Sequence, residues 1–155
     1  MEKISVRSAT IALTFCLCTF FAAAQTKPNL TGTWKMNSSK SAFENANNHP
    51  SEITIKFDQK DSSFTELLTV TENGEHKMDL KYTADGKETT NQFENHPVQT
   101  SASWEGETLV IEVKFEQDKL FIRKITISSD GKTMTMTVHH AKDENASDTV
   151  VLEKQ

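Results

Sequence analysis

Residues 105–140 read EGETLVIEVKFEQDKLFIRKITISSDGKTMTMTVHH, and this stretch decides the fold. Apolar and polar side chains alternate from Leu109 to Phe115 and again from Thr133 to Val138. Alternation of this kind places the apolar set on one face of a β-strand and the polar set on the other. Asp130-Gly131 lies just before the second run, and Asp-Gly is a strong signal for a tight hairpin turn. The stretch is therefore predicted to form consecutive antiparallel strands.

The same alternation extends over the chain from residue 30 onward, with further turn signals at Asn73-Gly74, Asp85-Gly86 and Glu105-Gly106. No run of ten or more residues has an apolar stripe at helical spacing. We predict about ten strands, at residues 30–36, 51–58, 63–71, 76–83, 87–93, 97–104, 107–115, 119–128, 132–140 and 148–154. Such a series of hairpins predicts an all-β, up-and-down antiparallel meander of about 8–10 strands closed into a β-barrel. A two-sheet sandwich of immunoglobulin type is the alternative.

Two polar stretches interrupt the pattern. Residues 38–50, SSKSAFENANNHP, are rich in Asn and Ser and end in Pro, which predicts a loop or a short helical turn. Residues 141–147 are also polar, and Gln117-Asp118 is predicted to form a further turn. Because there is no linker or charge run, residues 25–155 are predicted to form one domain.

Residues 1–24 have the layout of a secretory signal peptide. Lys3 and Arg7 precede an almost wholly apolar run from Ile11 to Phe21, and three alanines then lead to a predicted cleavage site between Ala24 and Gln25. The run is shorter than the roughly 20 apolar residues of a transmembrane helix. We therefore expect a secreted or periplasmic protein, with an uncleaved N-terminal anchor as the alternative.

Charge and cysteine content narrow the function further. The chain without residues 1–24 has 15 basic and 21 acidic side chains, a net charge of −6. Phosphate backbones and anionic lipid heads repel a protein of this sign, so we expect neither nucleic acid nor a membrane surface as partner. Both cysteines, Cys16 and Cys18, lie in the predicted signal peptide, so a disulfide framework is not expected in the remainder. We expect a monomer.

The start and end of the predicted domain resemble a known group. Residues 29–36 read NLTGTWKM, with Gly32 and Trp34 as a Gly-x-Trp motif, and the chain closes with DGKTMT at 130–135 and EKQ at 153–155. These pieces resemble the calycins, meaning lipocalins and fatty-acid-binding proteins, and small secreted bacterial lipocalin-like proteins. The resemblance implies that Trp34 plugs the closed end of a barrel, that Gly32 allows close passage of the chain, and that the interior binds a ligand. In calycins an arginine usually lies across this tryptophan, whereas the last strand here offers only Lys154.

Arg123 is the only arginine outside the predicted signal peptide. On its predicted strand it shares a face with Phe121 and Ile125, so an inward Phe121 implies an inward Arg123. A guanidinium in an apolar interior requires a partner, and a ligand carboxylate is a suitable bidentate one. The alternative is that Arg123 pairs with an internal Glu or lies across Trp34.

Other candidate ligand-binding residues accompany Arg123 and Phe121. Tyr82, the sole tyrosine, offers a ligand its hydroxyl or is a core residue with that hydroxyl satisfied. Met134 and Met136 are adaptable side chains that suit either a permissive pocket or ordinary core packing. Trp104, just before a predicted turn, marks a pocket mouth or packs across strands.

Catalytic and metal-binding signatures are missing from the sequence. His139-His140 are adjacent, so on a strand they point to opposite faces, and His49, His76 and His96 have no ligand spacing. We expect no metal, no cofactor and no enzymatic activity. The predicted function is binding of a small hydrophobic ligand inside the barrel, anionic if Arg123 anchors it. The alternatives are a protein-interaction or inhibitor barrel of the cell envelope with no ligand cavity, and a barrel enzyme.

Overall fold

The computed structural model describes residues 26–115, 118–140 and 146–155. These residues form ten strands: β1 (Gly32–Met36), β2 (Glu52–Lys60), β3 (Ser63–Thr71), β4 (Glu75–Thr83), β5 (Thr89–Phe93), β6 (His96–Glu105), β7 (Thr108–Phe115), β8 (Asp118–Ile127), β9 (Thr133–His140) and β10 (Ser147–Lys154). All ten predicted strands are confirmed, with ends displaced by at most two residues. The predicted signal peptide with its cleavage site, Gln117 and residues 141–145 lie outside the described residues.

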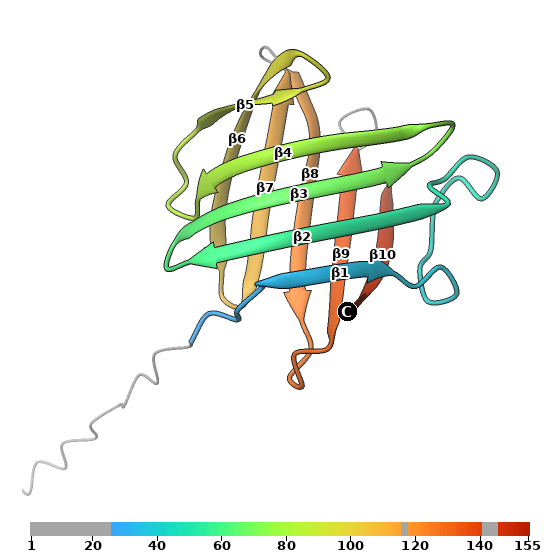
Figure 1. The fold of residues 1–155 in the computed structure, drawn as a ribbon, viewed down its shortest axis with the longest axis horizontal. Coiled ribbons are helices and arrows are strands. Elements are labelled where there is room, and N and C mark those ends of the chain that lie inside the picture. The colour runs from blue at the N-terminus through green and yellow to red at the C-terminus, as the bar shows by residue number, and fades with distance from the viewer. Residues whose placement is uncertain (1–25, 116–117, 141–145) are drawn as a thin grey trace, which may run out of the picture.

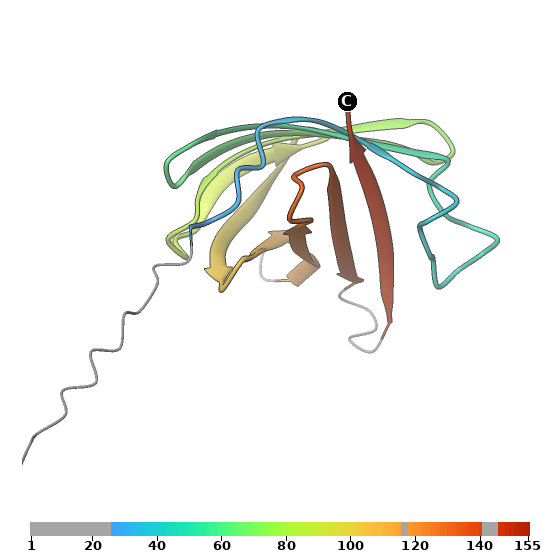
Figure 2. The ribbon, with the colours of Figure 1, turned by 90° about the horizontal axis from the view of Figure 1, so that it is seen from below.

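The strands close into one antiparallel barrel. Each strand pairs with its neighbour in sequence, and β1 also pairs with β10, which joins the two ends of the sheet. In Figure 1, β1 to β4 form a front layer that crosses the layer of β6 to β10 behind it at a steep angle. Figure 2, turned to view from below, shows the strands curving around a common interior. The predicted barrel is therefore confirmed and the sandwich excluded.

Alternate residues of each strand point into the barrel. In β3, Phe64, Glu66 and Leu68 are buried, whereas their neighbours Thr65 and Leu67 are exposed. Such period-two burial is what the sequence alternation predicts. The largest fully buried side chains are Trp34, Arg123, Phe57, Leu30, Ile55, Leu80, Leu109, Ile111, Ile125, Met134, Leu152 and Glu66. Two of these twelve, Arg123 and Glu66, are charged.

Residues with positive φ occur at the predicted turns Asn73-Gly74, Asp85-Gly86, Glu105-Gly106 and Asp130-Gly131, whereas the predicted turn at Gln117-Asp118 lies partly outside the described residues and Asp118 begins β8. Asn73 and Gly131 have positive φ angles of 52° and 70°, as tight turns require. Residues 37–51 form a loop between β1 and β2, and the described residues contain no helix. Accordingly, no helix long and apolar enough to cross a membrane occurs in the part of the chain that the structure describes.

The junction between β4 and β5 is the shortest in the barrel. Only Met78↔Phe93 and Asp79↔Gln92 are paired there. The side chain of Asn91 extends the junction, because its Oδ1 accepts from Lys81 N at 2.8 Å and its Nδ2 donates to Lys81 O at 3.1 Å. A side-chain amide thus makes hydrogen bonds that the backbone of β5 does not make.

Trp34 is packed at the β10 C-terminal end of the barrel, and we call this end the closed end. Its side chain is fully buried, and its Nε1 donates to Leu30 O at 2.8 Å. Lys154 lies opposite Trp34 in the sheet, with Nζ 5.2 Å from the ring centroid, so the lysine makes the cation–π contact that the resemblance assigns to an arginine.

Gly32 sits beside this contact and permits it. Its φ is +137°, where L-residues are rarely found, and a Cβ added to it would lie 2.8 Å from Lys154 Cε.

Replacing Gly32 with Ala is expected to lower the free energy of unfolding by about 1–3 kcal/mol, from backbone strain and displacement of Lys154. Urea denaturation measures this loss. Gly131→Ala is the matched control, because Gly131 has a φ of +70° with open space around it. Its free energy of unfolding should fall by less than that of Gly32→Ala. Equal losses at the two glycines would contradict the assigned role of the Lys154 contact.

Candidate ligand-binding site

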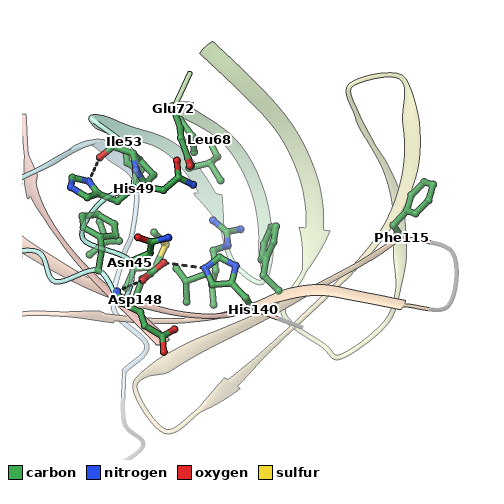
Figure 3. Close-up of a pocket in the computed structure, with 18 of the residues that line it drawn as sticks. Asn45, His49, Ile53, Leu68, Glu72, Phe115, His140 and Asp148 are labelled. Carbon is green, nitrogen blue, oxygen red and sulfur yellow. Dashed lines mark hydrogen bonds and ion pairs between the residues drawn. The ribbon is translucent and has the colours of Figure 1, made fainter. Parts of the chain in front are cut away.

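A cavity of about 1320 Å³ opens at the end of the barrel opposite Trp34. Its walls come from the start of β2, the end of β3, the end of β7, the start of β8, the end of β9 and the start of β10. The lining residues are Phe43, Glu44, Asn45, Asn48, His49, Pro50, Ile53, Leu68, Val70, Glu72, Phe115, Asp118, Phe121, Arg123, Met136, Val138, His140, Asp148 and Val150. Several of them surround the opening in Figure 3. We call this end the mouth.

The loop of residues 37–51 forms one side of the mouth and is tied to β10. Ala42 and Thr149 exchange two backbone hydrogen bonds of 2.8 Å. Asp148 adds a further tie, because its Oδ1 accepts from Glu44 N at 2.9 Å and its Oδ2 lies 3.0 Å from His140 Nε2. Figure 3 shows the His140–Asp148 contact beside Asn45. The loop therefore has a defined position at the mouth.

Aromatic rings provide part of this loop's apolar surface. The rings of Phe43 and His49 are stacked, with centroids 4.7 Å apart. Both rings line the cavity. A loop that is polar in sequence thus contributes apolar surface at the opening.

An ion pair crosses the barrel beneath the cavity. Arg123 of β8 and Glu66 of β3 form a bidentate pair, in which NH1 donates to Oε1 and NH2 donates to Oε2 at 3.0 Å. The Tyr82 hydroxyl of β4 donates to the same Oε2 at 2.8 Å. Arg123 and Glu66 are 1% and 0% exposed, so the pair is removed from solvent. Charge-assisted bidentate pairing is the arrangement that a buried guanidinium requires.

The pKa values of these groups follow from their burial and their partners. Burial opposes the charged form of Arg123, but the attraction and hydrogen bonds of Glu66 outweigh it, so the pKa of Arg123 is raised above its ordinary value. Burial, together with the negative charge of Glu66, raises the pKa of Tyr82 well above its usual range. Tyr82 is therefore a neutral donor, and the guanidinium remains charged.

The structure brings four of the six candidate ligand-binding residues together near the cavity. Arg123, Phe121 and Met136 line it, and the Phe121 ring centroid lies 5.6 Å from the Arg123 guanidinium carbon. Phe121 and Arg123 share the inward face, as predicted. Tyr82 lies beneath them with its hydroxyl satisfied by Glu66.

Met134 and Trp104 lie away from the mouth. Met134 is fully buried near the start of β9, whereas the cavity adjoins the end of that strand. Trp104 packs against Phe64 at the start of β3, with ring centroids 6.3 Å apart. Its position therefore favours cross-strand packing over a place at the mouth.

Sequence reasoning missed Glu66, the partner of Arg123. A signal for it exists, since Glu66 occupies the inward position between Phe64 and Leu68. A carboxylate in that position requires a buried partner. The internal-Glu alternative for Arg123 matches the contact that the structure shows, and Lys154 rather than Arg123 lies over Trp34.

His49 and His140 both line the mouth, whereas His76 and His96 lie elsewhere. His76 Nδ1 lies 2.5 Å from Glu94 Oε1 at the surface, and His96 makes an edge contact with Phe115. Among the described residues no group of three or more His, Cys, Asp or Glu side chains is arranged to hold a metal ion.

Comparison with known proteins identifies similar folds. A secretory abundant heat soluble protein of Ramazzottius varieornatus superposes with a TM-score of 0.62 at 15% identity, covering 84% of this chain and 98% of that one. The fatty acid transporter REP1-NXSQ gives a TM-score of 0.60 at 14% identity, covering 81% and 96%. Secretory abundant heat soluble protein 4 of R. varieornatus gives 0.57 at 12% identity, covering 81% and 94%.

No family model and no curated protein matches the sequence. The structural likeness shows the fold, a calycin-like barrel of ten strands. Membership of the lipocalin family stays a prediction.

Proposed function

We propose that this protein reversibly binds a small hydrophobic molecule in the barrel interior and acts outside the cytoplasm after removal of its signal peptide. The cavity at the mouth is the observation that carries this proposal, because much of its wall is apolar and continuous with the core. Ile53, Leu68, Val70, Met136 and Val138 supply that wall. The similarity to a barrel named as a fatty acid transporter supports the same class of ligand.

Burial of an alkyl or ring system supplies the binding free energy. Apolar surface removed from water contributes about 25 cal/mol per Å², and the cavity is larger than the roughly 300–1,000 Å³ typical of small-molecule sites. A few polar groups at the rim and floor then orient the ligand. The hypothesis of an anionic head rests on Arg123, but that guanidinium lies at the floor already paired with Glu66.

The alternative functions have less support. A protein-interaction or inhibitor barrel needs no interior cavity, whereas this barrel has a large one. A barrel enzyme needs a group of catalytic side chains, and Asp148, which contacts His140 at the rim, also accepts a hydrogen bond from Glu44 N in the loop of residues 37–51.

Mass spectrometry of the native protein purified from its own source is expected to detect a retained hydrophobic molecule. Titration with a fluorescent lipid probe should then give saturable binding in the micromolar range. Val138→Phe fills part of the cavity and should lower the affinity for the probe by about tenfold. Thr137→Phe is the matched control, because Thr137 is the adjacent residue on the outer face of β9 and should leave probe affinity unchanged. An empty protein that also fails to bind the probe would contradict the proposal.

A further inference from the structure

The charge of Arg123 is already neutralised inside the protein. Both carboxylate oxygens of Glu66 accept from its guanidinium, and the Tyr82 hydroxyl donates to Oε2 as well. All three side chains are buried, at 1%, 0% and 3% exposure. The floor of the cavity therefore carries no net charge to attract an anionic ligand.

One donor of this group nevertheless lacks a partner. Arg123 lines the cavity, and among the described residues its Nε, which is buried, has no hydrogen-bond acceptor. A buried N–H without an acceptor is costly, since it has lost water and gained nothing in exchange. An oxygen atom of a bound molecule would satisfy it after a small shift of the neighbouring side chains, because Nε itself has almost no accessible surface in the structure.

The rim adds negative charge above this floor. Glu44, Glu72, Asp118 and Asp148 line the cavity, and among the described lining residues Arg123 is the only Lys or Arg. Asp148 is engaged with His140 and the Glu44 backbone, but it still contributes its charge to the opening. Like charges repel, and interaction is stronger where the walls have a low dielectric. An anion entering the mouth therefore meets an unfavourable potential.

From these three observations we propose that the cavity selects a neutral amphiphile, whose hydroxyl, ester or carbonyl oxygen accepts a hydrogen bond from Arg123 Nε, and that it discriminates against free carboxylates. The proposal rests on the proposed function and specifies the head of its ligand.

The discrimination has a physical cause in Glu66. A ligand carboxylate at Arg123 would place a second negative charge beside that of Glu66. Both carboxylates would then be removed from water, with a single guanidinium to neutralise them. Desolvating an ion costs several times more than desolvating a neutral polar group. A neutral oxygen can accept from Nε without disturbing the pair.

Isothermal titration calorimetry measures the affinities for decanol, methyl decanoate and decanoate. These three molecules carry different head groups on matched alkyl chains. All three are used at neutral pH, decanoate below its micelle-forming concentration and the two neutral compounds below their solubility limits. We expect decanol and methyl decanoate to bind at least about tenfold more tightly than decanoate, because only the carboxylate must give up the hydration of a charge beside Glu66; tenfold corresponds to about 1.4 kcal/mol.

Glu66→Gln tests the cause. This variant keeps the shape of the side chain but leaves the Arg123 charge unneutralised, so decanoate affinity should rise by about tenfold or more and the preference should reverse. Glu72→Gln is the matched control, because it removes one negative charge from the rim without touching Arg123. It should change decanoate affinity by less than about threefold.

The outcomes separate this inference from the proposed function. If decanoate binds the unaltered protein as tightly as decanol, the inference is overturned while hydrophobic binding stands. If none of the three binds, the proposed function and the inference both fail. A folded Glu66→Gln protein with the original preference would overturn the role of the ion pair. Should Glu66→Gln fail to fold, the series on the unaltered protein decides by itself.

Discussion

Replacing Arg123 with Met is expected to lower the free energy of unfolding by about 3–5 kcal/mol, because it leaves the Glu66 carboxylate buried without its partner. Glu66 is fully buried, and its remaining side-chain donor is the Tyr82 hydroxyl. One neutral hydrogen bond does not replace the solvation of a carboxylate. Urea denaturation followed by far-UV circular dichroism measures the loss.

A double variant separates the penalty of breaking the pair from the net value of the pair. Arg123→Met with Glu66→Leu removes both charges and should recover most of the stability, since apolar replacements of a buried pair are often neutral or better. Lys124→Met is the control. Lys124 is the outward neighbour of Arg123, and its exposed pair with Glu105, at 3.9 Å, should contribute less than about 1 kcal/mol. If Arg123→Met lowered the free energy of unfolding by no more than Lys124→Met does, burial of the ion pair would be contradicted.

Replacing Trp34 with Ala is the second large change, with an expected loss of about 3–5 kcal/mol. The indole is fully buried, its Nε1 hydrogen bond to Leu30 O would be lost, and Lys154 would lose the ring that it covers. Because the structure around a deleted core side chain relaxes only partly, a void would remain.

Trp104→Ala is the control for Trp34, because Trp104 is only partly buried and packs at the edge of the core. Urea denaturation of both variants should give the larger loss for Trp34, with Trp34→Phe between the unaltered protein and Trp34→Ala. Equal losses for the two tryptophans would contradict the assignment of Trp34 as the plug of the closed end.

Strand order was predictable from local pattern alone, whereas closure was inferred from the series of hairpins with a two-sheet sandwich as the alternative. Alternation such as Leu109-x-Ile111-x-Val113 defines one face of a strand, and turns such as Asp130-Gly131 specify which strands are neighbours. Both signals are read within a few residues. The ten predicted strands therefore needed no knowledge of distant contacts.

Contacts across the barrel interior could not be predicted in the same way. Which inward residue of β3 meets Arg123 depends on strand tilt and stagger, and these are properties of the closed sheet. Glu66 occupies an inward position in the alternating pattern of β3, but that pattern does not indicate that it lies opposite Arg123. Similarly, the weak β4–β5 junction and its Asn91 hydrogen bonds depend on how far two strands diverge. The cavity depends on side chains from six strands and one loop meeting at the same end.

Methyl NMR during a titration with decanol tests the central claim, that the barrel binds hydrophobic molecules inside its mouth. Leu67 and Leu68 are adjacent in β3 and point to opposite faces, with Leu68 lining the cavity and Leu67 39% exposed on the outside. We predict saturable shifts of the methyl signals of Leu68, Met136 and Val138, with the signals of Leu67 unchanged. Shifts at Leu67 without shifts at Leu68, or no saturable shift at any of these residues, would contradict the claim.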